Sequence, residues 1–225
     1  MQEWKSGNFD AFHALDSEKQ KRIVNAALVE FGTKGFRRAS TNAIAENAEI
    51  GKGMLFYYFG SKEALFDFLC DYALAFAVNE YVGRYKTESR DFLERYKSLT
   101  EIKRATMENY PEFVTFFNSF FQSENAPYFE KCMEEYEKIR ADMISKVYDG
   151  IDYSLFRDDI DGREAVKYMK WLFDGYEQDI KARFNSGAVG LLDEGAVAEE
   201  WRKYYEFTAD LRKIFYRRVG SEEGR

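Results

Sequence analysis

The sequence predicts an all-α protein in which a small N-terminal head of three helices, containing a helix-turn-helix, is joined by a long fourth helix to a larger helical body, with about nine helices in total. Three observations favour this class. Apolar residues make up 45% of the 225 positions and recur mainly at helical spacing. Val, Ile and Thr do not cluster in the alternating runs typical of strands. The chain has two prolines, and Pro111 and Pro127 each open an apolar-periodic run, which is the tolerated first-turn position of a helix.

The first helix of the head is expected over 17–34. Asp16 or Ser17 can cap its N-terminus, and Gly35 lies just past its end, where a left-handed stop is common. The apolar residues of this helix that fall mostly on one face are Ile23, Ala26, Ala27, Leu28 and Phe31. Residues 1–16 are assigned to an N-terminal arm.

Two short helices are expected next, over 41–48 and about 51–58, joined by a tight turn at 49–51. Ser40 or Thr41 supplies the hydroxyl that caps the first of them. Three alanines in this first helix provide small side chains where two helices must cross. The spacing therefore predicts a helix-turn-helix.

A long fourth helix is expected where Ser61 caps the run SKEALFDFLCDYALAFAVNEY, and no flexible linker separates it from the head. We therefore divide the chain into an arm (1–16), a head (17–62) and a body (63–225). The later helices of the body are expected after Pro111, from Pro127 to Gly150, over about 163–184 and over 196–217, with a loop over 151–162.

Charge is unevenly distributed along the chain. The net charge is −7, yet residues 17–62 hold eight Lys or Arg against four Asp or Glu, so the head carries +4. A basic head on an acidic body is the distribution expected where one face of a protein meets phosphate groups.

The sequence disfavours several other function classes. No run approaches the ~20 apolar residues of a membrane span, and the start lacks the basic and apolar regions of a secretory signal. His13 is the only histidine, and Cys70 and Cys132 are far apart, so neither a zinc site nor a histidine-dependent hydrolase is expected. We therefore expect a cytoplasmic protein with no metal, no cofactor, no membrane partner and no enzymatic activity.

Residues 50–63 read IGKGMLFYYFGSKE, which is close to the TetR-family pattern V-S-K-G-x-L/I-Y-x-Y/H-F-x-S/N-K-E. Upstream, residues 23–36 read IVNAALVEFGTKGF, close to the family's I-x-x-A-A-x-x-x-F-x-x-x-G-F/Y. The chain thus resembles the TetR family of transcriptional regulators over about residues 20–66, roughly a fifth of its length. Independently, Gly51-Lys52-Gly53 gives the second short helix an uncluttered N-terminal end, which can enter a major groove ~12 Å wide.

The resemblance implies that the head binds double-stranded DNA. Hydroxyls would cap the second helix and contact phosphate, the recognition helix would present its N-terminal end to the groove, and Lys62 would hold a phosphate. The implied contact residues are Arg38, Ser40, Thr41, Lys52, Gly53, Met54, Tyr57 and Lys62. Leu55, Tyr58 and Phe59 are implied to be core residues.

Two residues depart from the family pattern. Gly51 replaces the usual serine, so a hydroxyl that caps the helix and binds phosphate is missing, although glycine is still an acceptable N-cap. Phe56 replaces a frequent tyrosine, so this position cannot donate a hydrogen bond to phosphate. Both changes weaken individual contacts and leave the prediction of the fold intact.

The family resemblance also implies a ligand pocket and a homodimer in the body. Aromatic side chains with few polar neighbours suit an apolar ligand, and the candidate pocket residues are Phe113, Phe116, Phe117, Phe120, Tyr168 and Trp171. The last two long helices would pair with a second subunit, through Phe173, Tyr176, Ile180, Tyr204, Thr208, Leu211 and Phe215. A dimer is also required on physical grounds, because a single helix-turn-helix makes few contacts.

The sequence therefore favours a bacterial repressor, nucleoid-associated when bound, that leaves a pseudo-palindromic operator when a small apolar or aromatic effector binds the body. Three alternatives remain open: a TetR-like DNA-binding protein controlled by a protein partner, a helical scaffold whose head no longer binds DNA, and, least favoured, an enzyme.

Overall fold

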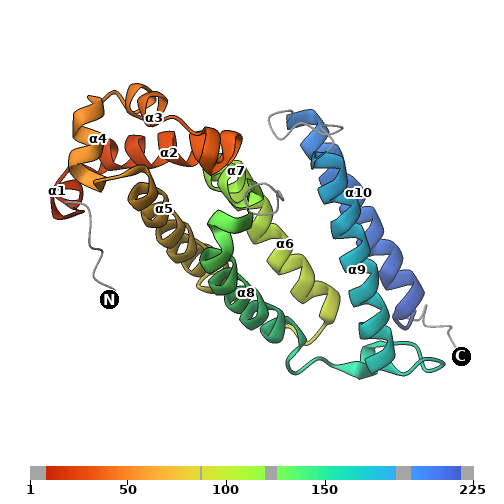
Figure 1. Cartoon of the computed structure of the whole chain (residues 1–225). Helices are drawn as coiled ribbons and strands as arrows, with labels where there is room; N and C mark the ends of the chain where they lie inside the picture. The colour runs from red at the N-terminus through yellow and green to blue at the C-terminus, as the bar shows by residue number, and fades with distance from the viewer. Residues whose placement is uncertain (1–8, 87, 120–125, 186–193, 219–225) are drawn as a thin grey trace, which may run out of the picture. The chain divides into compact units, whose positions relative to one another are not determined.

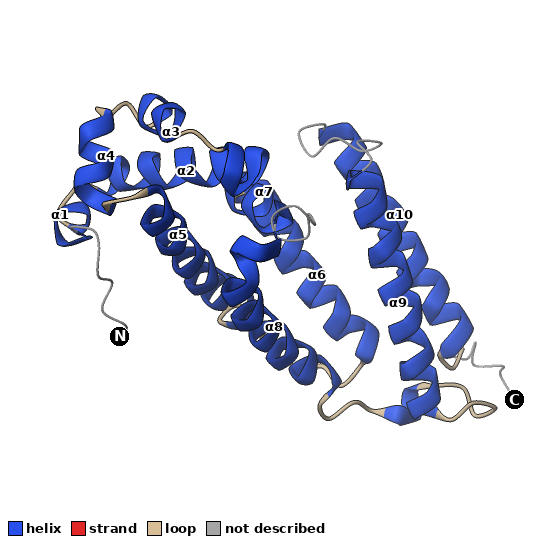
Figure 2. Cartoon of the chain, viewed as in Figure 1, coloured by secondary structure: helices blue, strands red, loops and turns tan. Residues whose placement is uncertain are grey.

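The computed structural model describes residues 9–86, 88–119, 126–185 and 194–218 (Figure 1). Within these residues the chain forms helices and no strand (Figure 2), with one isolated bridge between Phe156 and Tyr216. The predicted all-α class is confirmed. The chain divides into two compact units: Met1–Lys86 with Ser98–Lys146, and Thr87–Lys97 with Val147–Arg225.

The head helices of the first unit follow the predicted order: α2 (Ser17–Arg38), α3 (Thr41–Asn47), α4 (Lys52–Phe59) and α5 (Lys62–Ala77). Asp16 caps α2, because its carboxylate accepts a hydrogen bond from the Lys19 backbone nitrogen at 2.8 Å. Gly35 interrupts α2 with a φ of 69°, the left-handed conformation expected of a glycine stop.

A short helix, α1 (Phe9–His13), lies within residues 1–16, which were predicted to form an N-terminal arm. Phe12 is only 1% exposed, and its ring centre lies 5.1 Å from that of Phe59 and 5.2 Å from that of Phe68. The end of the assigned arm is therefore part of the core beneath α4. A five-residue helix is too short to show the periodicity on which the sequence prediction depends.

The rest of the first unit contains the π-helix η1 (Val78–Val82), most of α6 (Phe92–Asn109), α7 (Pro111–Ser119) and α8 (Ala126–Tyr148). Both prolines lie in the first turn of a helix, as predicted. Helix α7 packs closely on α2: a Cβ atom added at Gly32 would lie 2.9 Å from the backbone nitrogen of Phe116. The absent side chain therefore lets the two backbones approach each other.

The second unit contains the 3-10 turn η2 (Tyr153–Leu155), α9 (Gly162–Asn185), α10 (Glu194–Phe215) and the first residues of α6. Tyr96 of α6 stacks on Phe173 of α9 with ring centres 4.0 Å apart. The Tyr216 hydroxyl, just past α10, donates to Asp91 at 2.7 Å and accepts from the Leu93 backbone nitrogen at 3.1 Å. The first turn of α6 is thus tied to the end of α10.

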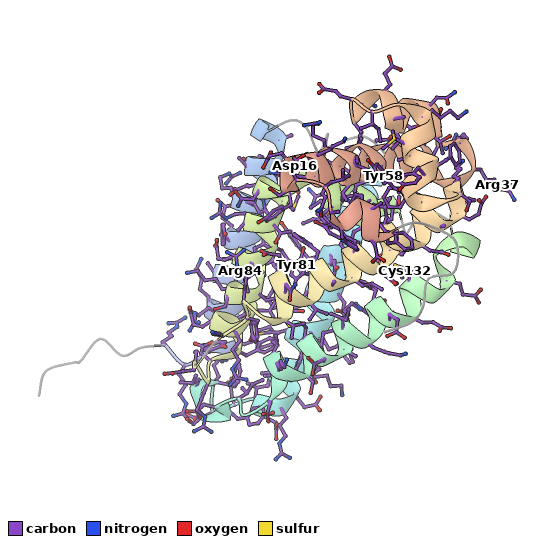
Figure 3. The ribbon with its side chains drawn as sticks, turned by 90° about the vertical axis from the view of Figure 1, so that its left-hand side faces the viewer. Asp16, Arg37, Tyr58, Tyr81, Arg84 and Cys132 are labelled. Atoms are coloured by element: carbon purple, nitrogen blue, oxygen red, sulfur yellow. The ribbon has the colours of Figure 1, made fainter. Side chains whose placement is uncertain are left out.

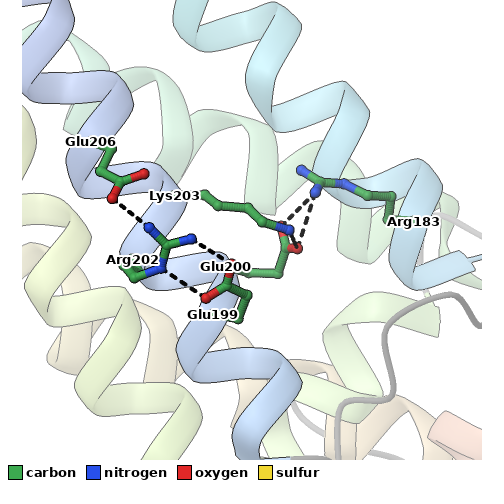
Figure 4. A network of polar contacts seen from close by, with 6 residues as sticks. All are labelled: Arg183, Glu199, Glu200, Arg202, Lys203 and Glu206. Atoms are coloured by element: carbon green, nitrogen blue, oxygen red, sulfur yellow. Dashed lines mark hydrogen bonds and ion pairs between the residues drawn. The ribbon is translucent and has the colours of Figure 1, made fainter.

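An ion-pair network links α9 and α10 within the second unit (Figure 4). The buried carboxylate of Glu200 pairs with Arg183 of α9 at 2.8 Å and with Lys203 at 2.9 Å. Having two cationic partners compensates for burying this carboxylate.

None of the helices in the described ranges is long and apolar enough to cross a membrane.

Candidate DNA interface

The turn between α3 and α4 is built from backbone hydrogen bonds and one left-handed residue. The backbone nitrogen of Ile50 donates to the Ala45 carbonyl at 2.9 Å, and Glu49 has a φ of 56°. Gly51 is the N-cap of α4 with an ordinary φ of −68° and no capping side chain. The turn predicted at 49–51 is confirmed, and its left-handed residue is Glu49.

The inner faces of α3 and α4 form a tightly packed core. Ile44, Ala45 and Ala48 are buried where the helices cross, and Leu55, Tyr58 and Phe59 are buried from the α4 side. The core role implied for the last three is confirmed. Figure 3 shows Tyr58 lying among the helices, whereas Arg37 lies at the edge of the same unit. Because this core is complete, the orientation of α4 is fixed by packing.

The outer face of α4 is exposed and combines one positive charge with large apolar side chains. Lys52 and Gly53 at its N-terminal end are exposed, and the Lys52 ammonium lies 5.8 Å from the centre of the Phe56 ring. Met54 and Tyr57 are also exposed, Tyr57 to 54%. The structure therefore brings Lys52, Gly53, Met54 and Tyr57 onto one accessible helix. Phe56 belongs to the same surface and was not among the predicted contacts, because it cannot donate a hydrogen bond.

The predicted residues at the start of α3 have intramolecular contacts. Ser40, and not Thr41, is the N-cap: its hydroxyl accepts from the Ala43 backbone nitrogen at 3.3 Å. Thr41 is the half-buried first residue of the helix. The Arg38 Nε donates to the Lys34 carbonyl at 3.1 Å, and the residue is exposed.

Lys62 is placed differently from the other candidates. Its ammonium group donates to the carbonyl oxygens of Ala39 at 2.6 Å and Arg37 at 3.3 Å, and the side chain is half-buried. The structure thus directs Lys62 toward the protein's own backbone at the connection between α2 and α3.

Part of this helix-turn-helix region matches a known protein family. Residues 23–68 match the model described as "Bacterial regulatory proteins, tetR family". This N-terminal domain belongs to the TetR family. The match covers α3, α4 and most of α2, so the family relationship rests on the helix-turn-helix described above.

Relatives of this chain include helix-turn-helix regulators. The HTH-type transcriptional regulator YuxN of Bacillus subtilis is 30% identical over 72% of this chain and 53% of its own. The HTH-type transcriptional regulator RutR of Escherichia coli is 39% identical over 34% of this chain and 43% of its own. The chain thus spans about half the length of these curated relatives.

Solved structures show the same fold over most of the chain. A TetR family transcriptional regulator from Chloroflexus aurantiacus has a TM-score of 0.56 at 18% identity, covering 93% of this chain and 98% of that one. The ketosteroid transcriptional regulator KstR2 of Mycobacterium tuberculosis has a TM-score of 0.56 at 18% identity, covering 91% and 97%. At this identity the likeness concerns the fold alone.

The candidate pocket residues are distributed over both units. Phe113 and Phe116 are buried in the first unit, where Phe113 stacks on Phe76 with ring centres 3.9 Å apart. Phe117 is half-buried, with its ring centre 5.7 Å from that of Tyr136. Tyr168 and Trp171 are exposed on α9 of the second unit, and Phe120 lies outside the described residues.

The candidate dimer residues mostly face the interior of their own unit. Phe173, Tyr204, Leu211 and Phe215 are buried, whereas Tyr176, Ile180 and Thr208 are half-buried. Among the side chains of α9 and α10 that the structure describes, the large apolar ones that are exposed are instead Tyr168, Trp171, Leu172 and Ile214. Sequence reasoning missed Leu172 and Ile214 as interface candidates, although Tyr168, Trp171 and Leu172 already have the i, i+3, i+4 spacing of one helix face.

Proposed function

We propose that the chain is a sequence-specific DNA-binding transcriptional regulator, and that it acts as a repressor. The observation that carries this proposal is the outer face of α4, where Lys52, Gly53, Met54 and Tyr57 are accessible on a helix fixed by its buried core. A helix entering the major groove needs this combination of rigid placement and uncluttered N-terminal end. The exposed Arg38 at the end of α2 and Thr41 at the start of α3 are proposed as phosphate contacts.

The proposed regulator binds DNA as a homodimer, since two recognition helices can read two half-sites with matched spacing. Support comes from α9, where Tyr168, Trp171 and Leu172 present an exposed apolar stripe. Gly175, one turn further on, has open space where a Cβ atom would lie. A small residue beside large apolar ones allows a second helix to approach closely. We therefore place the interface on this face of α9, with Ile214 of α10.

The proposed effector is a small apolar or aromatic molecule that binds residues 63–225, while residues 17–62 bind DNA. Support for coupling comes from the contact between α7 and α2, where Gly32 brings the two backbones together. A displacement of α7 therefore changes the position of the head through packing. The effector must bind the DNA-incompetent state more tightly, because equal affinity for both states shifts nothing. Control by a protein partner remains the alternative.

Selection of bound fragments from a random duplex pool tests this function. We expect a pseudo-palindromic site, and we expect log affinity to fall with log salt concentration by about 0.9 per phosphate neutralised. Lys52→Ala weakens binding, whereas exchange of an exposed lysine on α8, Lys146→Ala, leaves it unchanged. Failure to bind any duplex at low salt would contradict the proposal and favour a helical scaffold. We propose that the protein acts in the bacterial cytoplasm, where this DNA is accessible.

A further inference from the structure

The contacts of Lys62 join two segments that are far apart in sequence. Its ammonium group binds the carbonyls of Ala39 and Arg37 and lies 5.0 Å from the centre of the Phe36 ring. These three residues belong to the connection between the left-handed break at Gly35 and the N-cap of α3. Lys62 therefore fastens the start of α5 to the segment that leads into the helix-turn-helix.

The carbonyl partners of Lys62 offset an unfavourable electrostatic position. It is the first residue of α5, and a cation is unfavourable there because a helix N-terminus carries partial positive charge. Carbonyl oxygens supply the compensating negative charge. Hydrogen bonds from an ammonium group are also roughly twice as strong as neutral ones.

The same connection is held from its other side by α2. A carboxylate oxygen of Glu30 accepts a hydrogen bond from the Ser40 backbone nitrogen at 2.9 Å. Ser40 in turn caps α3 through its hydroxyl. Residues 36–40 are thus held by the Glu30 carboxylate of α2 and by the Lys62 ammonium group of α5. Helix α3 begins directly after this segment. The position of α3 then determines where α4 lies, because buried residues of α3 and its C-cap, Ala45 and Ala48, face the buried side of α4.

We propose that Lys62 is a positioning residue for DNA binding, which holds residues 36–40 and α3 so that α4 is presented correctly, and that it does not hold a phosphate. This inference rests on the proposed function and differs from the role implied by family resemblance. It predicts that loss of the ammonium group loosens α3 without removing a phosphate contact.

Lys62→Met and Lys52→Met form a matched pair, since both remove one positive charge by the same substitution. In urea, we expect Lys62→Met to raise the equilibrium constant for unfolding on the order of tenfold, as loss of a charge-assisted hydrogen bond does, and Lys52→Met to leave it unchanged. Amide hydrogen exchange over residues 41–47 should accelerate only in Lys62→Met. Lys62→Arg, which retains donors and charge, should restore most of the protection.

Measurements of DNA affinity against salt concentration distinguish a positioning role of Lys62 from a direct phosphate contact. The probe is a duplex that the wild-type chain selects from a random pool, titrated at a temperature where every variant is folded. Lys52→Met should reduce the slope of log affinity against log salt by about 0.9. Lys62→Met should weaken binding several-fold at every salt concentration while changing the slope by less than half that amount. A purely structural role would leave affinity unchanged under these conditions.

Two results would overturn the inference: a loss of about 0.9 in the salt slope for Lys62→Met, or wild-type affinity in that variant. If the wild-type chain selects no duplex, the proposed function fails. Hydrogen exchange then still tests whether Lys62 holds residues 36–40 and α3 in place. Faster exchange over residues 41–47 in Lys62→Met would support the fastening role, and unchanged exchange would refute it.

Discussion

Gly32 shows how a missing side chain sets the spacing of two helices. A Cβ atom there would lie 2.9 Å from both the Phe116 nitrogen and the Thr115 carbonyl carbon. Both are backbone atoms, which cannot rotate away as a flexible side chain does. The contact between α2 and α7 therefore depends on glycine at this position.

Gly32→Ala should destabilise the protein by about 1–3 kcal/mol, the usual cost of overpacking a core. Gly53→Ala is the matched control, because nothing lies within 4 Å of its added Cβ atom. The control should gain up to about 1 kcal/mol from helix propensity and should lose DNA affinity, since its methyl group projects from the groove-facing end of α4. Urea unfolding measures both variants; equal stabilities would contradict the close approach.

The raised pKa of Tyr216 predicts that the free energy of unfolding falls at alkaline pH. Burial raises its pKa, and the hydrogen bond with Asp91 raises it further; burial also raises the pKa values of Tyr96 and Tyr148. A phenol is neutral when protonated, so a folded-state pKa above the unfolded value of about 10 means that the native state retains the proton. This stabilisation is complete below pH ~10 and is lost as the pH rises further.

Tyr216→Phe should therefore make the fall in stability above pH ~10 less steep. At pH 7 the same variant should lose about 1 kcal/mol, because the hydroxyl bonds to Asp91 and to the Leu93 backbone nitrogen disappear. Urea unfolding at pH 7, 9 and 10.5 gives both quantities. A Tyr216→Phe protein that keeps the wild-type alkaline slope would refute the assignment.

At the scale of elements, α1 extends the core of the helix-turn-helix head beyond the family match, which begins at residue 23. Phe12 contacts Tyr58 and Phe59 of α4 with ring centres 6.3 and 5.1 Å apart, and Phe68 of α5 with ring centres 5.2 Å apart. This five-residue helix packs beneath α4, and it gains its stability from that packing, since isolated helices of this length are unstable.

Phe12→Ala should destabilise the protein by about 3–5 kcal/mol, as expected for removal of a buried aromatic ring. DNA affinity should fall with it, because the support beneath α4 is lost. Asp10→Ala, on the exposed face of the same helix, is the control and should change stability by less than about 1 kcal/mol. Thermal unfolding monitored by circular dichroism distinguishes them. Similar midpoints for the two variants would show that α1 does not contribute to the core.

The sequence was sufficient to predict most of the long helices and the helix-turn-helix because both have strong local signals, but it gave no bounds for the 18-residue helix α6 (Phe92–Asn109). Gly35 and Ser61 marked the end of one helix and the start of another, and both appear in the structure at those places. Which apolar face of a long helix points inward is a tertiary property. Phe173 and Trp171 lie two positions apart on α9, yet one is buried and the other is 58% exposed.

The contacts of charged side chains could also not be predicted from the sequence. Lys62 belongs to a motif whose resemblance implied phosphate, and its neighbours along the chain do not show that the carbonyls of Arg37 and Ala39 lie within reach. These contacts join residues separated by 25 and 23 positions. Only the folded arrangement of α2 and α5 brings them together.

At the scale of the whole molecule, the proposed dimer depends on the exposed stripe of α9. Trp171→Glu should convert the protein to a monomer, because a buried, unpaired carboxylate is strongly unfavourable at an interface. Light scattering after gel filtration measures the mass. Lys146→Glu on α8, a charge change at an exposed site in the other unit, should leave the mass unchanged. A dimeric Trp171→Glu protein would place the interface elsewhere.

The two units are interleaved in sequence: residues 87–97 belong with the C-terminal part, and the segment between 98 and 146 belongs with the head. A recombination event that exchanged residues 1–62 as a cassette would separate Gly32 from the α7 backbone on which it packs. A recipient lacking a matching α7 would receive a head with an uncovered face on α2. Such interleaving restricts the modular exchange of DNA specificities to donors whose α7 is compatible, so the head and its supporting helix should be inherited together.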